Sequence, residues 1–433
     1  MTNSDHQPGA THWTPTRERL LLLTLAAIQF TTVLDFLIIM PLGPQYMRVF
    51  HINPRQFGLI VSAYGISAGA TGLAAGFFLD RFDRKLALLW LYSGFAIGTL
   101  LCALSPNYHL LVASRFVAGA FGGVVGATIL AIIGDVVPME RRGAAMGMVM
   151  SAFSVASIVG IPLGLWLAGD SGGSLHLGSL SGWHLPFFAL AALSAVIVAV
   201  AASITPSLRG HLEHIAEEEH PVARTWAVMV HPDHQKAFVF MSALTCAGFC
   251  VFPYISSYMV ANVGVRENQL WIIYLCGGLC TLFSMNLVGR WSDRAGKLRV
   301  FTITSLTTTV PILALTNLPH VPLALAVATS TLLMVCMSSR MVPAMAMMTA
   351  TVEARYRGGF MSINSAVQQL SMGMASFVTG LILGQNEKGE VTHFPINGIL
   401  SIMCVYSCIY LARFLKAPAK SETMVEPVAM ETM

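Results

Sequence analysis

Long apolar stretches separated by short polar turns repeat along almost the whole chain. A helix needs about 20 apolar residues to cross the hydrocarbon core of a bilayer, and by this measure the sequence predicts twelve membrane-spanning helices. They cover residues 20–46, 54–79, 86–104, 108–134, 143–168, 185–204, 236–262, 268–291, 299–317, 321–349, 359–384 and 395–414. The stretch that begins at Leu20 is too long for the core of a cleaved signal peptide, so this first helix is expected to stay in the mature protein.

A longer polar segment, residues 206–235, divides the chain into two halves. It contains three prolines, an acidic run at residues 217–219 and five histidines. The histidines lack regular ligand spacing and cysteine partners, so a solvated linker is favoured over a zinc site. The expected organisation is a tail at 1–19, a six-helix bundle at 20–205, the linker at 206–235, a second six-helix bundle at 236–414 and a tail at 415–433.

The two halves carry related motifs. The turn Gly-Phe-Phe-Leu-Asp-Arg-Phe-Asp-Arg-Lys at 76–85 has a weaker copy at 289–299, with Gly, Asp and Arg at the same offsets. A second pair of basic turns, each followed by glycine and small residues, lies at 140–147 and 354–361. Because one register of about 213 to 215 residues relates both pairs, the pattern indicates a transporter built from duplicated bundles.

Composition agrees with a membrane protein. Of the 433 residues, 55% are hydrophobic and 11% are charged, whereas about a quarter are charged in a typical soluble domain. The eight cysteines all fall in apolar stretches, where packing is favoured over a metal or redox site. The sequence shows no catalytic or nucleotide-binding motif, which argues against an enzyme or a primary pump.

The placement of basic residues predicts the orientation. With twelve helices both termini share one side, which carries nineteen Lys and Arg residues against four on the other side. Basic residues favour the cytoplasmic side, so the termini and the linker are expected to be cytoplasmic. The net charge of +4 is therefore interpreted as topology, and no nucleic-acid partner is expected.

The turn that begins at Gly76, its copy at Gly289 and the twelve apolar stretches together resemble the major facilitator superfamily. The run Arg-Phe-Val-Ala-Gly-Ala-Phe-Gly-Gly at 115–123 is similar to the fourth-helix motif of its drug and metabolite proton antiporters, which include multidrug and sugar-efflux permeases. Gly-Ile-Pro-Leu-Gly at 160–164 resembles part of their fifth-helix motif, but departs from it at Ile161 and Leu165. The resemblance implies an all-α membrane protein in which two pseudo-symmetric six-helix bundles rock about a central cavity. The residues assigned to helix packing are Gly119, Gly122, Gly160, Pro162 and Gly164.

Three charged residues lie inside apolar stretches, where charge is costly and usually functional. Asp35 is the only acidic residue placed deep in a predicted helix, about halfway along the first one. An apolar environment makes a carboxylate easier to protonate, so Asp35 is a candidate proton carrier, with Arg115 and Arg340 as candidate partners. The alternatives are a permanent ion pair with either arginine, a helix-anchoring role for Arg115, and a role for Arg340 in binding an anionic substrate group.

The repeated turn is a candidate gate. Gly76 permits close helix approach, Asp80 is placed to cap a helix N-terminus, and Arg84 is placed to pair with Asp135 at the end of the fourth helix. Such contacts would lock one face in one state and break in the other. The alternative is that the basic residues of the turn only set topology. The corresponding residues of the second half are Gly289, Asp293 and Arg294.

The expected function is secondary transport. The favoured form is proton-coupled export of a small amphipathic compound such as a drug, a sugar or a metabolite, and the alternative is uptake or facilitated diffusion of a nutrient by the same fold. The proton is the only coupling ion expected, with no other cofactor and no metal. The protein is expected to act as a monomer in a cell membrane, with a bacterial inner membrane favoured. The candidate cavity residues are Gln29, Tyr64, Phe252, Tyr254, Asn364 and Gln368.

Overall fold

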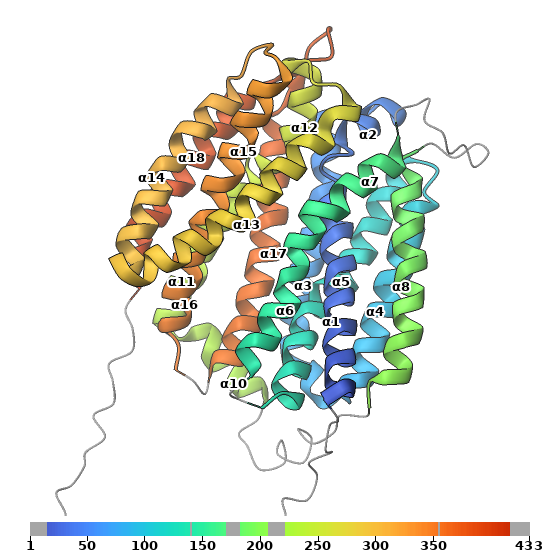
Figure 1. The fold of residues 1–433 in the computed structure, drawn as a ribbon, viewed down its shortest axis with the longest axis vertical. Helices are drawn as coiled ribbons and strands as arrows, with labels where there is room; N and C mark the ends of the chain where they lie inside the picture. Colours follow the sequence, from blue (N-terminus) through green and yellow to red (C-terminus); the bar gives the residue numbers. More distant parts are fainter. Residues whose placement is uncertain (1–14, 139–140, 170–181, 207–220, 354–355, 416–433) are drawn as a thin grey trace, which may run out of the picture.

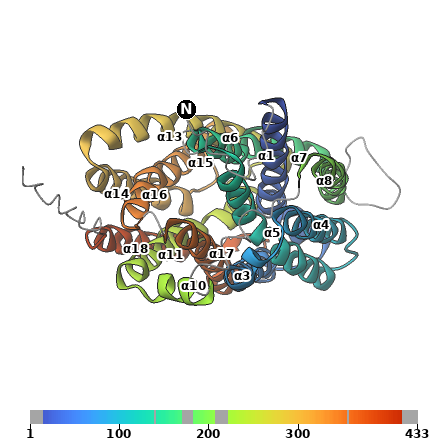
Figure 2. The same ribbon diagram turned by 90° about the horizontal axis from the view of Figure 1, so that it is seen from below.

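Two groups of long helices, one from each half of the chain, lie side by side (Figures 1 and 2). The structure is a computed structural model that describes residues 15–138, 141–169, 182–206, 221–353 and 356–415. In Figure 1 the lower end of the molecule is where α1 begins and α18 ends, and we call it the terminal end. The upper end carries the short helix α2, and we call it the α2 end.

The first half contains six spanning segments. Its helices are α1 (Pro15–Ile38), α2 (Gly43–Val49), α3 (Pro54–Phe78), η1 (Leu79–Arg81), α4 (Arg84–Ala103), α5 (Tyr108–Val136), α6 (Arg142–Val155), the π-helical turn η2 (Ala156–Gly160), α7 (Ile161–Ala168) and α8 (His184–Ile204). The segment α6–η2–α7 forms a single span, Arg142–Ala168.

The helices of the second half are interrupted more often. It contains α11 (Pro232–Phe249), η3 (Phe252–Tyr254), α12 (Ile255–Tyr258), η4 (Met259–Val263), η5 (Glu267–Gln269), α13 (Leu270–Ala295), α14 (Lys297–Thr316), α15 (Leu323–Ser339), α16 (Met341–Ala350), α17 (Arg357–Ile382) and α18 (Phe394–Ala412). A short antiparallel hairpin, β1 (Gly384–Gln385) and β2 (Val391–Thr392), joins α17 to α18.

Among the described residues, eleven helical segments are long and apolar enough to cross a membrane. Helix α17 is as long as these, but it carries Asn364, Gln368 and Gln369, which lower its hydropathy. It packs along α3 where the two halves meet (Figure 2). A helix that contacts protein on several sides needs fewer apolar residues than one that faces lipid, so α17 is the predicted helix 359–384 and completes the set of twelve.

Several predicted helix ends are wrong, and proline explains most of them. The first predicted helix, 20–46, is two helices, because α1 ends at Ile38 shortly before Pro41 and Pro44. The seventh is broken next to Pro253, and the tenth is broken at Arg340, three residues before Pro343. Part of the predicted linker is helical, as α10 (Pro221–Val230), and α11 begins at Pro232.

The two halves meet along α3 and α17. At Gly65 an added Cβ would lie 2.8 Å from the Cα atom of Gly373, so the two backbones are in direct contact there. On the other side of the molecule α13 packs against η2 and α7. At the α2 end an ion pair between Arg48 and Glu267 joins the halves. The linker helix α10 contacts both α3 and α17 at the terminal end (Figure 1).

Candidate functional site: a buried ion pair in the first half

Asp35 of α1 and Arg115 of α5 form an ion pair inside the first half. Arg115 Nη1 donates to Asp35 Oδ2 at 2.6 Å, and both side chains are 0% exposed. Thr99 of α4 donates its hydroxyl to Asp35 Oδ1 at 3.1 Å. Removing one partner of such a pair leaves an uncompensated buried charge, at a cost of about 3–5 kcal/mol. Of the two predicted partners, Asp35 contacts Arg115 and not Arg340.

The ion pair lies nearer the α2 end than the sequence predicts. The prediction that Asp35 is halfway along its helix is wrong, because α1 ends at Ile38 and Asp35 belongs to its last turn. It is nevertheless buried. Tyr46 of α2 packs against Trp183 with ring centroids 5.1 Å apart, and both aromatic residues are buried. These two rings pack together at the α2 end of the first half.

The guanidinium of Arg115 is only partly satisfied. Nη1 also reaches the carbonyl oxygen of Asp35 at 3.4 Å, and the guanidinium carbon lies 4.5 Å from the ring centroid of Tyr64. Nε and Nη2 have no hydrogen-bond partner among the described residues. Because a guanidinium offers five N–H donors, Arg115 keeps donors for another acceptor. Its burial excludes the alternative in which it anchors α5 to lipid headgroups.

Two glycines of the motif at 115–123 position the aromatic ring beneath Arg115. An added Cβ at Gly119 would lie 2.4 Å from the carbonyl oxygen of Tyr64, and one at Gly122 would lie 2.5 Å from its hydroxyl oxygen. Neither position has room for a larger residue, so these glycines let α5 approach α3 closely. The motif thus places Arg115 and its supporting ring in contact.

The fifth-helix motif packs on either side of Asp35. An added Cβ at Gly160 would lie 2.8 Å from the side chain of Leu34, and one at Gly164 would lie 2.6 Å from Ile38. Helix α7 begins at Ile161, directly after the π-helical turn η2, which ends at Gly160, and Pro162 is its second residue. Such turns are frequent at functional sites. The two motifs therefore lie on or against the helices that form the ion pair: residues 115–123 include Arg115, and residues 160–164 pack on α1 at Leu34 and Ile38.

Arg340 is buried by itself in the second half. It lies at the break between α15 and α16 and is 2% exposed. Its Nη2 donates to the carbonyl oxygen of Leu244 on α11 at 3.2 Å, while Nε and Nη1 have no partner among the described residues. No described carboxylate forms an ion pair with it.

In the turn after α3, the predicted contact is confirmed. Arg84 Nε lies 3.3 Å from Asp135 Oδ2. The residue that caps α4 is Asp83, which accepts from the backbone N–H of Lys85 at 2.9 Å, and the side chain of Asp80 lies outside the described part of the chain. Gly76 accepts a hydrogen bond from the hydroxyl of Thr225 on α10 at 3.1 Å. The gating role of these residues stays a prediction.

The copy of this turn in the second half has a different structure. Helix α3 ends two residues after Gly76, whereas α13 continues six residues past Gly289, to Ala295. Asp293 and Arg294 are therefore helical, and neither forms an ion pair with another residue in the described ranges. Only the first copy forms an ion pair between helices.

The candidate cavity residues are spread over the molecule. Tyr64 belongs to the ion-pair site, and Tyr254 donates its hydroxyl to the carbonyl oxygen of Ser376 at 2.6 Å. Gln29 and Asn364 each have a buried oxygen without a partner in the part of the chain that the structure describes. Phe252 and Gln368 are partly buried. Their role in binding a compound stays a prediction.

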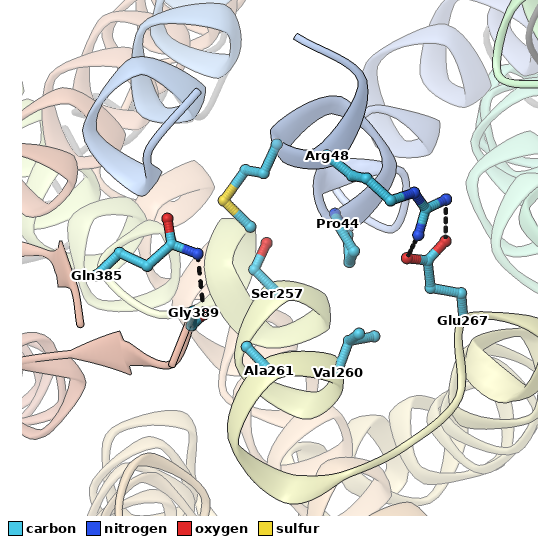
Figure 3. A pocket seen from close by; sticks show the side chains of 9 residues that line it. Pro44, Arg48, Ser257, Val260, Ala261, Glu267, Gln385 and Gly389 are labelled. Carbon is cyan, nitrogen blue, oxygen red and sulfur yellow. Dashed lines mark hydrogen bonds and ion pairs between the residues drawn. The ribbon is translucent and has the colours of Figure 1, made fainter. Parts of the chain in front are cut away.

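A pocket of about 240 Å³ lies at the α2 end between the halves (Figure 3). None of the candidate cavity residues lines it. Arg48 of α2 and Glu267 of η5 form a two-point ion pair there, with Nη2 and Oε2 3.0 Å apart. The lining residues are Pro44, Met47, Arg48, Ser257, Val260, Ala261, Glu267, Gln385 and Gly389.

Sequence reasoning missed Thr99 and the pair Arg48–Glu267. A polar threonine inside an apolar stretch is a signal that could have identified Thr99, but nothing in the sequence links Arg48 to a residue of the other half.

Of the linker histidines, only His231 and His234 are described. His234 is buried and its Nδ1 lies 3.0 Å from the carbonyl oxygen of Val228. The described residues include no group of three potential metal ligands.

The fold and the site define a class: a multi-pass helical membrane protein of two six-helix halves with a buried ion pair in the first. A family model described as Major Facilitator Superfamily matches residues 25–285 and 237–428. The chain belongs to this superfamily, and it is a membrane transporter, not an enzyme.

Relatives and solved structures support this assignment. The chain is 24% identical over 392 residues to the "Uncharacterized MFS-type transporter YceJ" of Bacillus subtilis (strain 168), covering 88% of this chain and 94% of that protein. It is 27% identical over 183 residues to "Multidrug resistance protein 2" of the same organism, covering 42% and 43%. The fold matches a bacterial homologue of the human lysosomal transporter Spinster, crystallised in an inward-facing and unoccupied conformation, with a TM-score of 0.73, 15% identity and 93% and 95% coverage.

Proposed function

We propose that this protein exports a small amphipathic compound in exchange for protons. The observation that carries the proposal is the buried pair of Asp35 and Arg115. Asp35 is the only acidic residue of the described ranges that is 0% exposed, and its partner keeps unused donors. Ionisable groups inside a membrane protein commonly mark proton or substrate pathways.

The pair suits proton coupling because protonation changes its charge balance. A proton on Asp35 neutralises the carboxylate and removes the attraction that holds Arg115 in place. An unpaired buried guanidinium is unfavourable by about 3–5 kcal/mol. A rearrangement of the helices that carry the pair, which gives Arg115 a new partner, therefore becomes favourable. The ring of Tyr64 is placed to keep Arg115 near the site during that step.

Two observations favour export over uptake. Residues 160–164 resemble the antiporter motif and pack against α1 at Leu34 and Ile38, on both sides of Asp35. A relative that matches nearly half of the chain is named a multidrug resistance protein. We place the terminal end in the cytoplasm, because most basic residues lie there. The closed end in this structure, with the Arg48–Glu267 pair, then faces the outside.

The test uses proteoliposomes that contain a trapped pH-sensitive dye. A panel of amphipathic compounds is screened for those that cause proton movement with the wild-type protein. With any such compound, we expect Asp35→Asn to lose this movement at least tenfold, because the amide cannot carry a proton. Asp233→Asn, at an exposed acid of α11, is the matched control and should behave as wild type. Undiminished proton movement with Asp35→Asn would contradict the proposal.

A further inference from the structure

Arg340 is not the second-half copy of Arg115. In the 215-residue register that relates Arg142 to Arg357, the position of Arg115 is taken by Ser330 and that of Asp35 by Cys250. Arg340 corresponds to Val125, ten residues further along α5 than Arg115. At 1.5 Å per residue it lies roughly 15 Å nearer the terminal end than the ion pair. The repeat therefore gives no reason for a buried charge at this place.

Within the described ranges, no carboxylate pairs with this charge. The two buried acids among the described residues are both engaged, Asp35 by Arg115 and Glu18 by Arg141. The titratable groups that interact with Arg340 are the thiols of Cys404 and Cys408 on α18. A buried guanidinium with one hydrogen bond, to a carbonyl oxygen, is far from satisfied. Its remaining donors are available to an acceptor that is not part of the chain.

The surroundings of Arg340 suit an anionic group. Arg340 stands at the N-terminus of α16, a ten-residue helix whose dipole favours negative charge there. Gly248, one turn after Leu244 on the same face of α11, has no atom within 4 Å of an added Cβ, which leaves open space beside the contact. Met337 and Met341, next to Arg340, are partly buried and offer adaptable apolar surface.

We infer that Arg340 binds the acidic group of the transported compound, and that the substrates are amphipathic anions with a carboxylate or sulfonate on an apolar body. This inference rests on the proposed transport function and narrows its substrate class. A guanidinium pairs well with such groups because its N–H donors match their oxygen atoms.

The test measures thermal unfolding in nanodiscs of phosphatidylcholine, whose headgroups carry no net charge. Two matched probe series are used: octanoate, octanamide and octylamine, and cinnamate, cinnamamide and cinnamylamine. We expect at least one acid to stabilise the wild-type protein, and its amide and amine to bind at least tenfold more weakly.

Variants at Arg340 separate a binding role from a structural one. Arg340→Gln should weaken acid binding about ten- to a hundredfold, as expected for loss of hydrogen bonds to a charged group. Without a probe, Arg340→Gln should melt no lower than wild type, because it removes an unpaired buried charge. Arg340→Lys should keep a weaker preference for acids, and it serves as the second variant if Arg340→Gln does not fold. Arg299→Gln, at an exposed arginine of α14, is the control.

Equal binding of an acid to wild type and Arg340→Gln would overturn the inference. So would a lack of stabilisation by either acid, or stabilisation by the amides and amines alone. Binding in nanodiscs needs no proton gradient, so Asp35→Asn protein should keep the preference for acids. The binding experiment therefore tests the anion site, and the proteoliposome experiment tests proton coupling, so one hypothesis can be rejected while the other holds.

Discussion

The rings of Phe36 and Phe249 lie with their centroids 6.0 Å apart and join the two halves of the molecule next to the buried ion pair. Phe36 follows Asp35 in α1, and Phe249 is the last residue of α11. Phe36 also packs on Tyr64 at 5.4 Å, and Tyr64 lies beneath Arg115. A continuous set of contacts therefore leads from the charged pair to the second half.

This contact predicts that Phe249→Ala separates proton movement from compound movement. A ring pair of this kind contributes about 0.5–1.5 kcal/mol beyond its buried area, so the protein should fold while the halves respond less to the state of Asp35. We expect a proton leak without compound, measured with the trapped dye in proteoliposomes. Phe116→Ala, at an exposed ring of α5, should show no leak. If the Phe249→Ala protein shows no proton leak and exchanges compound for protons as wild type does, the contact is not needed for coupling.

The close approach of α5 to α3 predicts a sharp difference between two glycines of one helix. Gly119→Ala places a methyl group 2.4 Å from the carbonyl oxygen of Tyr64, whereas Gly134→Ala meets no atom within 4 Å. Overpacking costs about 1–3 kcal/mol, so Gly119→Ala should unfold at a lower temperature. Gly134→Ala should equal or exceed wild type, since alanine favours a helix by up to about 1 kcal/mol. Equal melting temperatures of the two variants would mean that α5 can move away from α3 without loss of stability.

The pair Arg48–Glu267 predicts a closure at the α2 end that must open during transport. Arg48 is 49% exposed, so the ion pair itself contributes only about 0–1 kcal/mol, and charge removal alone should have a small effect. A covalent link is stronger. The double variant Arg48→Cys/Glu267→Cys should lose compound-driven proton movement when a bifunctional thiol reagent with a cleavable disulfide in its spacer joins the two thiols, and it should recover when reduction cleaves the spacer.

Each single-cysteine variant is the control for this cross-link, because it contains the native thiols but no new pair. Full activity of the cross-linked double variant, with the cross-link verified by mass spectrometry, would show that the α2 end does not separate at this point.

The sequence by itself determined the number of membrane helices, the division into two halves, the placement of Asp35 within the first membrane helix and the contact of Arg84 with Asp135. Hydropathy and a repeated motif are local properties, so they can be read along the chain without knowing which helices meet. The chain also pointed to the glycines around 119 and 160, although not to what they contact.

Only the tertiary structure decided which arginine pairs with Asp35, and it left Arg340 without a carboxylate. That choice depends on the rotation and spacing of α1, α4 and α5, which the close helix contacts at Gly119 and Gly160 fix, because no larger residue fits at either position. The same holds for Arg48 and Glu267, which are 219 residues apart in sequence. Apolar periodicity places a residue within a helix, but ion pairs between distant segments form only after packing has fixed how the helices face each other.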